Sequence, residues 1–431
     1  MKRWLLLIAA WASLAQAGTV RHFLWDANQR PLYQRCATAF EAAHPGTRIR
    51  IEHQGWDDYW TTLSTGFISD TAPDVFTNHI LKHPDFVANG VLVNLSPLIA
   101  RDRVAVDRFE PGLLPMWQHK GRQYAMPTDW DTIAFAVNLD HARRMGVGLD
   151  ELRRLTWNPR DGGSLQPLLA RLTVDEAGRP ATDPAFDRRR VKVWGYLNPG
   201  DGNMMGQTEW SHYAASAGFR FQREPWDPDL RYGDPVLADT LQWLAGLGAA
   251  GLAPTPQQMG RLGADALFVN GRGAIVPSGT WMIGHFLRHA KFAHTWVALP
   301  VGPSGQRTSM RNGLALSIWA GSPRREEAWQ WVRHVASREC QQILAESGVL
   351  YPAWQGLAAM AVAKQQAMGV DTQVFLDAAA GVTFPPPVAP HGAEVSDLMS
   401  ATIQRILAGR VKAAEVLPDT ERRVRQITRR P

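Results

Sequence analysis

The order of hydrophobic and polar positions near the start of the chain predicts alternating strands and helices. Short apolar runs predict strands at residues 20–25, 48–53 and 74–77. Apolar residues spaced three and four positions apart predict helices at 30–43 and 57–67, between these strands. This order is typical of a parallel sheet with covering helices, and therefore of an α/β fold.

A second set of elements follows, interrupted by a change in composition. Residues 156–190 are polar and rich in Gly and Pro, so we expect a surface excursion there. Around this segment the pattern predicts strands within 123–138 and at 191–196 and 273–276, and helices at 210–217, 235–247, 324–337 and 396–407. Two α/β lobes joined by more than one crossover fit this order.

The first 17 residues have the pattern of a secretion signal. Lys2 and Arg3 precede an apolar run at 4–15, and Ala15-Gln16-Ala17 is a small-x-small cleavage site. A membrane anchor would need a longer run, of about 20 apolar residues. No cysteine follows the cleavage point, so we expect a soluble periplasmic protein that starts at Gly18, carries no lipid and is a monomer.

Charge argues against a nucleic-acid partner. The chain has 46 Lys and Arg against 40 Asp and Glu, a net charge of +6, and these charges are scattered rather than clustered with aromatic residues. The exception is the arginine-rich end, at Arg422, Arg423, Arg425, Arg429 and Arg430. We expect it to be the solvated face of a last helix.

The sequence predicts no cofactor, no metal and no catalytic residue of a common type. It has no phosphate-binding glycine loop, no H-E-x-x-H and no G-x-S-x-G. His79 and His83, like His285 and His289, have a spacing that two ligands of one metal could use, but no carboxylate stands at a matching position. Two cysteines, Cys36 and Cys340, are too few for a disulfide scaffold. Export permits a disulfide, but we expect two free, buried thiols.

Tryptophan is over-represented, with 18 Trp against 7 Tyr and 15 Phe. Trp329 and Trp331 lie on a predicted amphipathic helix and are expected in the core. Three others, Trp56, Trp130 and Trp281, stand at predicted strand ends among polar residues, where an indole can stack on the face of a sugar ring. Their neighbours Asp57, Asn78, Asp129 and Asp131 could bond the hydroxyls at the edge of such a ring.

Seven segments together resemble one family, the extracellular solute-binding proteins of sugar-importing ABC transporters, of the maltose-binding type. They occur in the family's order and cover nearly the whole mature chain. The segments are GWDDYWTTLSTGFISDTAPDVF (55–76), DFVANGVLVNLSPLI (85–99), YAMPTDWDTIAFAVN (124–138), FVNGRGAIVPSGTW (268–281), ALPVGPSG (298–305), EEAWQWVRHVASRECQ (326–341) and ILAGR (406–410).

The resemblance implies a two-lobed periplasmic-binding-protein-like fold of type II, with a ligand cleft between the lobes and several hinge crossovers. It places the first lobe at 18–130 plus 312–350 and the second at 131–311 plus 351–431. Its cleft positions fall on Trp56, Asp57, Asn78 or His79, Asp131, Trp281 and Tyr351, and the hinge includes Arg311 and Asn312.

The resemblance also implies a function. We expect the chain to capture a sugar between the lobes and to deliver it to membrane permease subunits, without catalysis. Two alternatives stay open. The same scaffold could bind a phosphorylated polyol, with Arg311 as its cation, or a polyamine, with Asp57, Asp129 and Asp131 as its acids. A periplasmic hydrolase or lyase would need a further carboxylate facing the pair around Trp130.

Overall fold

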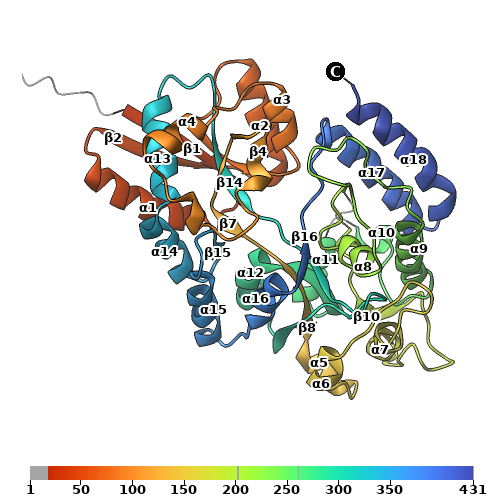
Figure 1. Ribbon diagram of the computed structural model, residues 1–431. Coiled ribbons are helices and arrows are strands. Elements are labelled where there is room, and N and C mark those ends of the chain that lie inside the picture. The colour runs from red at the N-terminus through yellow and green to blue at the C-terminus, as the bar shows by residue number, and fades with distance from the viewer. Residues whose placement is uncertain (1–17, 201–202, 261, 431) are drawn as a thin grey trace, which may run out of the picture.

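The computed structural model describes residues 18–200, 203–260 and 262–430. In this part of the chain, two five-stranded sheets with covering helices form two lobes that lie side by side (Figure 1). The expected two-lobed α/β architecture is confirmed. The expected signal segment, residues 1–17, lies outside the described residues.

The first sheet has the strand order β2-β1-β3-β14-β6. Its first three strands run parallel, and β14 pairs antiparallel with β3 and β6. The predicted strands therefore form, and a distant segment completes the sheet. The bounds are β1 Gly18–Leu24, β2 Thr47–His53, β3 Val75–His79, β6 Met126–Pro127 and β14 Leu314–Ile318.

Helices of the first lobe begin and end largely where the sequence predicts. Helix α1 (Arg30–Ala43) has a proline in its first turn, ends before Pro45 and buries Leu32, Cys36 and Phe40 on one face. Trp329 and Trp331 of α13 are fully buried, as expected. The other helices of this lobe are α2 Trp56–Ile68, α3 His83–Ala88, α4 Ser96–Arg101, α13 Arg325–Val335 and α14 Arg338–Ser347, with short 3-10 turns η1 Val106–Arg108 and η2 Pro115–Trp117 and the hairpin β4 Gln118–His119 and β5 Arg122–Gln123.

Cys36 and Cys340 form a disulfide, so the expectation of two free thiols is wrong. The bond joins α1 to α14 across a sequence separation of 304 residues, with the Cα atoms 5.3 Å apart. Each cysteine lies on the buried face of its helix, and these two faces pack together. Local sequence carries no information on that packing, and so could not decide the redox state.

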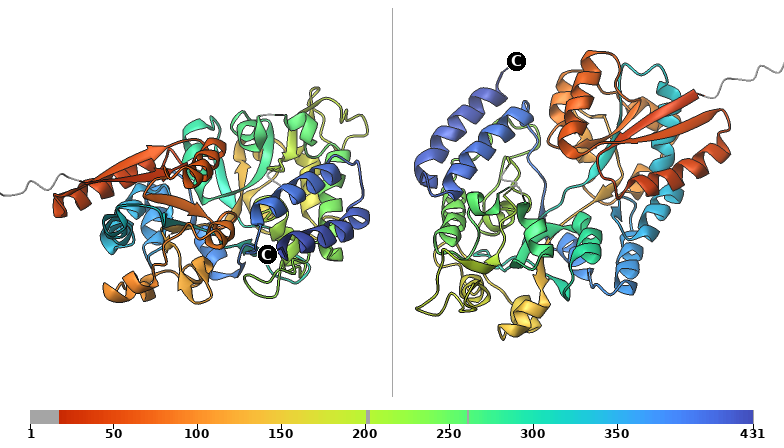
Figure 2. Two further views of the ribbon diagram at one scale, coloured as in Figure 1. Left: turned by 90° about the horizontal axis from the view of Figure 1, so that it is seen from above. Right: turned by 180° about the vertical axis from the view of Figure 1, so that it is seen from behind.

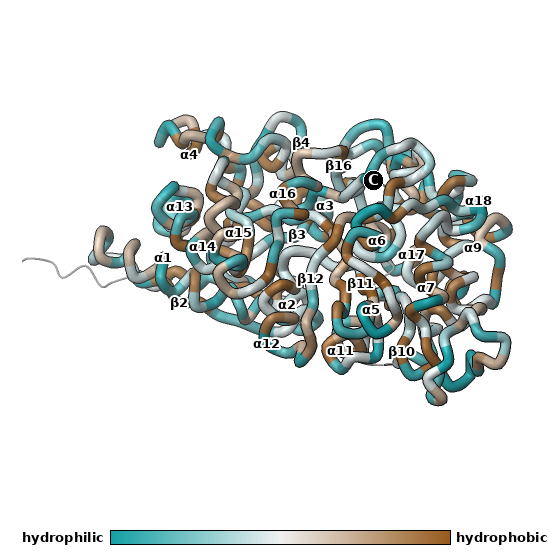
Figure 3. Tube along the Cα trace, turned by 90° about the horizontal axis from the view of Figure 1, so that it is seen from below, coloured by the Kyte–Doolittle hydropathy of each residue, from teal (hydrophilic) through white to brown (hydrophobic). Residues whose placement is uncertain are grey.

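The second sheet has the order β12-β8-β11-β10-β9. Strands β8 and β11 lie inside it and every one of their residues is buried, which is why they read as continuous apolar runs. Figure 3 shows hydrophobic positions along β11, among others. The bounds are β8 Ile133–Asn138, β9 Val174–Asp175, β10 Val191–Tyr196, β11 Gly273–Gly279 and β12 His294–Val297.

Part of segment 156–190 is core rather than a surface excursion. Helix α7 buries four leucines at 165, 168, 169 and 172, and β9 joins the second sheet. The polar, glycine-rich composition of the flanking loops hid this short amphipathic helix. The helices on this side are α5 Leu139–Arg144, α6 Leu149–Arg153, α7 Leu165–Leu172, α8 Ser211–Ser216, α9 Pro235–Ala249, α10 Pro256–Met259, α11 Gly263–Val269, α12 Ile283–His289 (after η3 Thr280–Met282), α16 Gln373–Ala380, α17 Gly392–Leu407 and α18 Ala413–Thr428. Helix α15 (Ala358–Ala367) packs mainly against α14 of the first lobe.

The last helix, α18, carries the terminal arginines on its outer side, as expected. Arg422 bonds Asp419, and Arg425 and Arg429 both reach Asp229, with 36–66% of each of these charged side chains exposed. Figure 2 shows α17 and α18 on the side of the second lobe away from α1. No helix in the described ranges combines the length and the apolar character needed to cross a bilayer.

Three connections join the lobes in the described part of the chain. The chain passes from β6 to β8, returns between β12 and β14, and passes again between α14 and α16. Short pairs tie these passages together: β7 (Asp129–Trp130) with β15 (Tyr351–Pro352), and β13 (Thr308–Met310) with β16 (Val382–Phe384). Gly313 lies so close to the Asp129 carbonyl that a Cβ there would be 2.3 Å from its oxygen.

Candidate ligand-binding cavity

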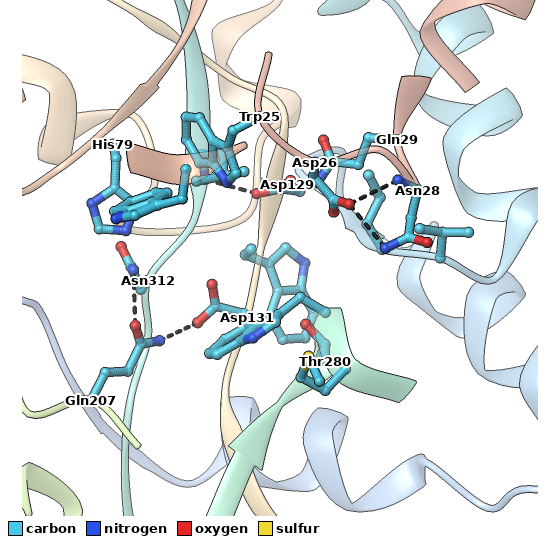
Figure 4. Close-up of a pocket in the computed structure, with 17 residues that line it drawn as sticks. Trp25, Asp26, Asn28, Gln29, His79, Asp129, Asp131, Gln207, Thr280 and Asn312 are labelled. Atoms are coloured by element: carbon cyan, nitrogen blue, oxygen red, sulfur yellow. Dashed lines mark hydrogen bonds between the residues drawn. The ribbon is translucent and has the colours of Figure 1, made fainter. Parts of the chain in front are cut away.

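A cavity of about 380 Å³ lies where the two lobes and their connections meet (Figure 4). This volume is within the range of small-molecule sites. Its wall has three parts, contributed by the first sheet, by the connections and by the second lobe.

The first-lobe wall comes from the carboxyl ends of two neighbouring parallel strands. Trp25, Asp26, Asn28 and Gln29 follow β1, and His79 ends β3. Ligands of parallel sheets usually bind at this edge. Asn28 donates its backbone N–H and its side-chain amide to the same Asp26 oxygen, at 2.8 and 2.9 Å, which holds that carboxyl at the cavity wall.

Aromatic rings form one corner of this wall. Trp56, at the start of α2, stands edge to face with Trp25 at 5.0 Å and with His79 at 5.4 Å between ring centroids. Trp60 packs behind Trp25 and Trp56. The backing rings hold Trp56 in place although 41% of it is exposed.

The connections supply the most buried polar groups of the cavity. Asp129 accepts a hydrogen bond from the backbone N–H of Leu314 at 2.7 Å. Gln207 links Asp131 to Asn312: its amide donates to Asp131 at 2.5 Å and accepts from Asn312 at 3.1 Å. In Figure 4 the second oxygen of Asp131 and the carbonyl oxygen of Asn312 both point away from Gln207, toward the open space.

The second-lobe wall carries Gln207, Thr280, Trp281 and Met282. Trp281 follows β11, and 37% of it is exposed. Gly279 makes room for its indole, because a Cβ at residue 279 would lie 1.9 Å from the Trp281 ring.

A hydrogen bond joins the two lobes at Asn28, one of the wall residues. The Arg288 guanidinium on α12 donates to the side chain of Asn28 at 2.7 Å. This contact joins the second lobe directly to the loop after β1.

Burial changes the acidity of the ionisable groups in the wall. It raises the pKa of Asp129 to about 7, with the neighbouring Asp26 adding to the effect. It raises the pKa of Asp131 well above the ordinary value, helped by Asp129 and opposed by the hydrogen bond from Gln207. Burial also raises the pKa of Asp26 and lowers that of His79 to about 4.

Seven of the sequence-predicted residues line the cavity together: Trp56, His79, Asp129, Trp130, Asp131, Trp281 and Asn312. Asp57 points elsewhere from the first turn of α2 and is exposed. Asn78 is buried and bonds His83 and Ser317. These two side chains do not line the cavity.

Arg311 and Tyr351 also lie outside the wall. Arg311 pairs with Glu110 at 3.0 Å and stacks on Trp130 at 5.0 Å. Tyr351 is fully buried, and its hydroxyl bonds Gln365 and Thr372. Both residues support Trp130 from behind.

The binding residues predicted from the sequence leave out several residues of the wall. Asp26 and Asn28 directly follow the first predicted strand, where ligands of parallel sheets bind, so the sequence did point to them. Trp25 stands at the end of that strand, and tryptophan excess could have pointed to it. Gln207 lies in a segment without a pattern, and nothing local marks it. In the described residues, no cluster of three or more potential metal-ligating side chains occurs.

Two lobes, three connections and a polar, aromatic cavity between them define a class of protein, the two-lobed solute-binding proteins. The chain belongs to the bacterial extracellular solute-binding proteins, whose family model matches residues 35–369.

Comparisons with individual proteins agree with this family. A binding protein of Brucella abortus is 22% identical over 428 residues, which cover 96% of this chain and 94% of the relative. The ABC substrate-binding protein Lmo0181 of Listeria monocytogenes, solved in complex with cycloalternan, has a TM-score of 0.81 at 18% identity, and 95% and 98% of the two chains are covered. The maltose/maltodextrin-binding domain MalE of Bdellovibrio bacteriovorus, solved with maltotriose, has a TM-score of 0.74 at 17% identity, covering 95% and 99%.

Proposed function

We propose that this protein captures a sugar in the cavity between its lobes and delivers it to the permease of an ABC importer. One observation carries the proposal: Trp56 and Trp281, two large and partly exposed indoles, line the same cavity from opposite lobes. Carboxyl and amide groups of Asp129, Asp131 and Asn312 line the same cavity. Apolar plates with polar groups between them suit a ring that is apolar on its faces and polar at its rim.

Because residues of both lobes line the cavity, the lobes can capture a sugar by closing around it. We propose that residues 18–130 plus 312–350 and residues 131–311 plus 351–431 move as two units around the connections. A ligand shifts such an equilibrium only through contacts that one state has and the other lacks. A sugar held by Trp56 and His79 on one side and by Trp281 and Thr280 on the other gains those contacts only when the lobes are together.

Delivery to a membrane permease is the second part of the proposal. Proteins of this family are extracellular, and a leader at residues 1–17 would direct the chain to the periplasm. The closed, loaded form would be the one that the permease recognises. The neighbours solved with cycloalternan and with maltotriose support a carbohydrate as the solute.

A ligand screen followed by two variants tests the proposal. Thermal unfolding of the mature protein with a panel of mono- and oligosaccharides should identify a ligand by a rise in unfolding temperature. Small-angle scattering should then show compaction with that ligand. Calorimetry should show that Trp56→Ala and Trp281→Ala each weaken binding by roughly 30-fold, the effect of losing about 2 kcal/mol at an aromatic contact.

Trp354 provides the matched control. It is a partly buried tryptophan outside the cavity, next to Phe109. Trp354→Ala should leave the affinity unchanged. If no carbohydrate raised the unfolding temperature, or if the Trp56 and Trp281 variants bound sugar as tightly as the unchanged protein, the proposal would fail.

A further inference from the structure

Three carboxyl groups line the cavity, and no Lys or Arg in the described part of the chain lines it with them. Asp26 follows β1, and Asp129 and Asp131 stand side by side in the first connection. Asp129 is 5% and Asp131 is 9% exposed. Among the described residues, no Lys, Arg or His forms an ion pair with any of the three, and neither Lys nor Arg lines the cavity.

This arrangement is costly, because buried carboxylates are normally paired with a positive group. The nearest candidate in the sequence, Arg311, turns away from them. It pairs with Glu110 and stacks over the ring of Trp130. The acids of the wall thus have no positively charged partner, although Arg311 directly precedes the wall residue Asn312 in the chain.

A second group in the wall points to the same kind of ligand. Asn312 is 2% exposed, and its Oδ1 has no hydrogen-bond partner among the described residues. Its Nδ2 is already used by Gln207, so the free group is an acceptor. Figure 4 shows this oxygen turned away from Gln207 and toward His79, which also lines the cavity. An unpaired buried acceptor calls for a donor from the ligand.

The aromatic rings add to this preference. Indole faces carry negative quadrupole charge and attract a cation placed over them. Trp25, Trp56, Trp130 and Trp281 all line the cavity. A wall of acceptors, acids and indole faces disfavours a phosphorylated solute, since no fixed positive charge lines it. A neutral sugar can use the acids as hydrogen-bond acceptors, but only a solute with a positive charge also balances them.

We propose that the solute carries a protonated amine, held by Asp129 and Asp131 together with the free oxygen of Asn312. The inference rests on the proposed function, within which the solute is an amino sugar. The amine supplies the positive charge that the acids lack and the N–H donor that Asn312 lacks.

The raised pKa values of Asp129 and Asp131 agree with this assignment. Burial and mutual repulsion raise the pKa of both Asp129 and Asp131 in the protein without ligand. A cation placed between them would reverse that effect, because opposite charges favour the ionised form.

Matched sugars test the charge without altering the protein. Calorimetry at pH 7.5 compares D-glucosamine, D-galactosamine and D-mannosamine, each with its neutral hexose and its N-acetylated form, and uses putrescine as an amine without a ring. We expect at least one amino sugar to bind tenfold or more tighter than both of its uncharged counterparts. Binding of all forms with similar affinity would overturn the amine site and leave sugar capture standing.

Isosteric variants locate the charge. Asp129→Asn and Asp131→Asn should each reduce the preference for the amino sugar by tenfold or more and affect the neutral hexose much less. Asp58→Asn, an exposed acid on α2, is the control and should change neither. If the preference survived in both cavity variants, the assignment of the amine to these acids would be wrong.

The remaining outcomes separate the two proposals. Binding of putrescine with no binding of any sugar would support the amine site and overturn sugar capture. Failure of every amine in the panel to bind would overturn the amine site, whether or not a neutral sugar bound.

Discussion

Asp131 and Asn312 face each other in an antiparallel bridge where two of the connections between the lobes run side by side. The backbone N–H of Asp131 donates to the carbonyl of Asn312 at 2.9 Å, and the N–H of Asn312 donates back at 3.3 Å. Their side chains meet again through Gln207. The same two residues therefore belong both to the place where two connections run side by side and to the wall of the cavity, so a ligand that contacts them touches both connections.

Gln207 should matter for both ligand affinity and stability. Gln207→Ala leaves Asp131 and Asn312 without the side-chain partner that joins them, and an unsatisfied buried polar group costs about 1–3 kcal/mol. We expect a free energy of unfolding lower by about this amount and an affinity for the sugar about tenfold weaker. Gln342→Ala, an exposed glutamine that bonds only Glu346 among the described residues, is the control. Unchanged affinity and stability would show that the bridge has no role.

Gly279 should be required for the position of the Trp281 indole. Gly279→Ala places a methyl group within the space that the ring occupies, so the ring must turn away. We expect a loss of sugar affinity of at least tenfold, close to that of Trp281→Ala, measured by calorimetry. Gly246→Ala in α9 has nothing within 4 Å of the new Cβ and should leave binding intact, with a stability equal or slightly higher. Normal affinity in Gly279→Ala would contradict this reading of Trp281.

The disulfide between Cys36 and Cys340 should stabilise the first lobe. It closes a very long loop, and loss of such a bond typically costs about 2–4 kcal/mol. The double variant Cys36→Ser, Cys340→Ser should unfold at a lower temperature than the oxidised protein. Both cysteines are buried, so a reductant should act on the native protein only as it unfolds.

The unfolding temperature of the double variant should not respond to the reductant. Alkylation of the denatured, unreduced protein should modify no thiol at residues 36 and 340. Two modified cysteines in that experiment would contradict the bond.

Asp129 should make the stability of the ligand-free protein depend on pH. Its pKa rises from 3.8 in the unfolded chain to about 7 in the fold. The folded protein therefore binds this proton more tightly, and the resulting stabilisation is present at low pH and is lost as pH rises from about 4 through 7. At pH 8 the group is charged and buried, which costs a few kcal/mol relative to a neutral side chain.

Asp129→Asn tests this effect. In denaturant unfolding without ligand, the variant should be more stable than the unchanged protein by a few kcal/mol at pH 8, by less at pH 5, and nearly equal to it only below about pH 4. Buried histidines such as His22 and His212, whose pKa burial lowers, destabilise both proteins at low pH and cancel in the difference. A stability difference that does not change between pH 5 and 8 would contradict the raised pKa.

Several features of this protein follow from its sequence alone. The bounds of α1 and β10 match the predicted ones because apolar spacing and the flanking prolines act within a few residues. The polar residues after β1 and β3 could be placed at one edge because parallel strands share their carboxyl ends. Resemblance of ordered segments indicated the two lobes and drew attention to Asp131 and Trp281.

Tertiary structure alone decided how distant segments meet. Gln207 reaches Asp131 across 76 residues, and Cys36 reaches Cys340 across 304. Arg311 and Tyr351 lie beside cavity residues in the chain, yet one turns to Glu110 and the other to Gln365. Hydrophobic periodicity determines which face of an element is buried. Which other element packs against that face depends on the tertiary structure, and local sequence patterns do not specify it.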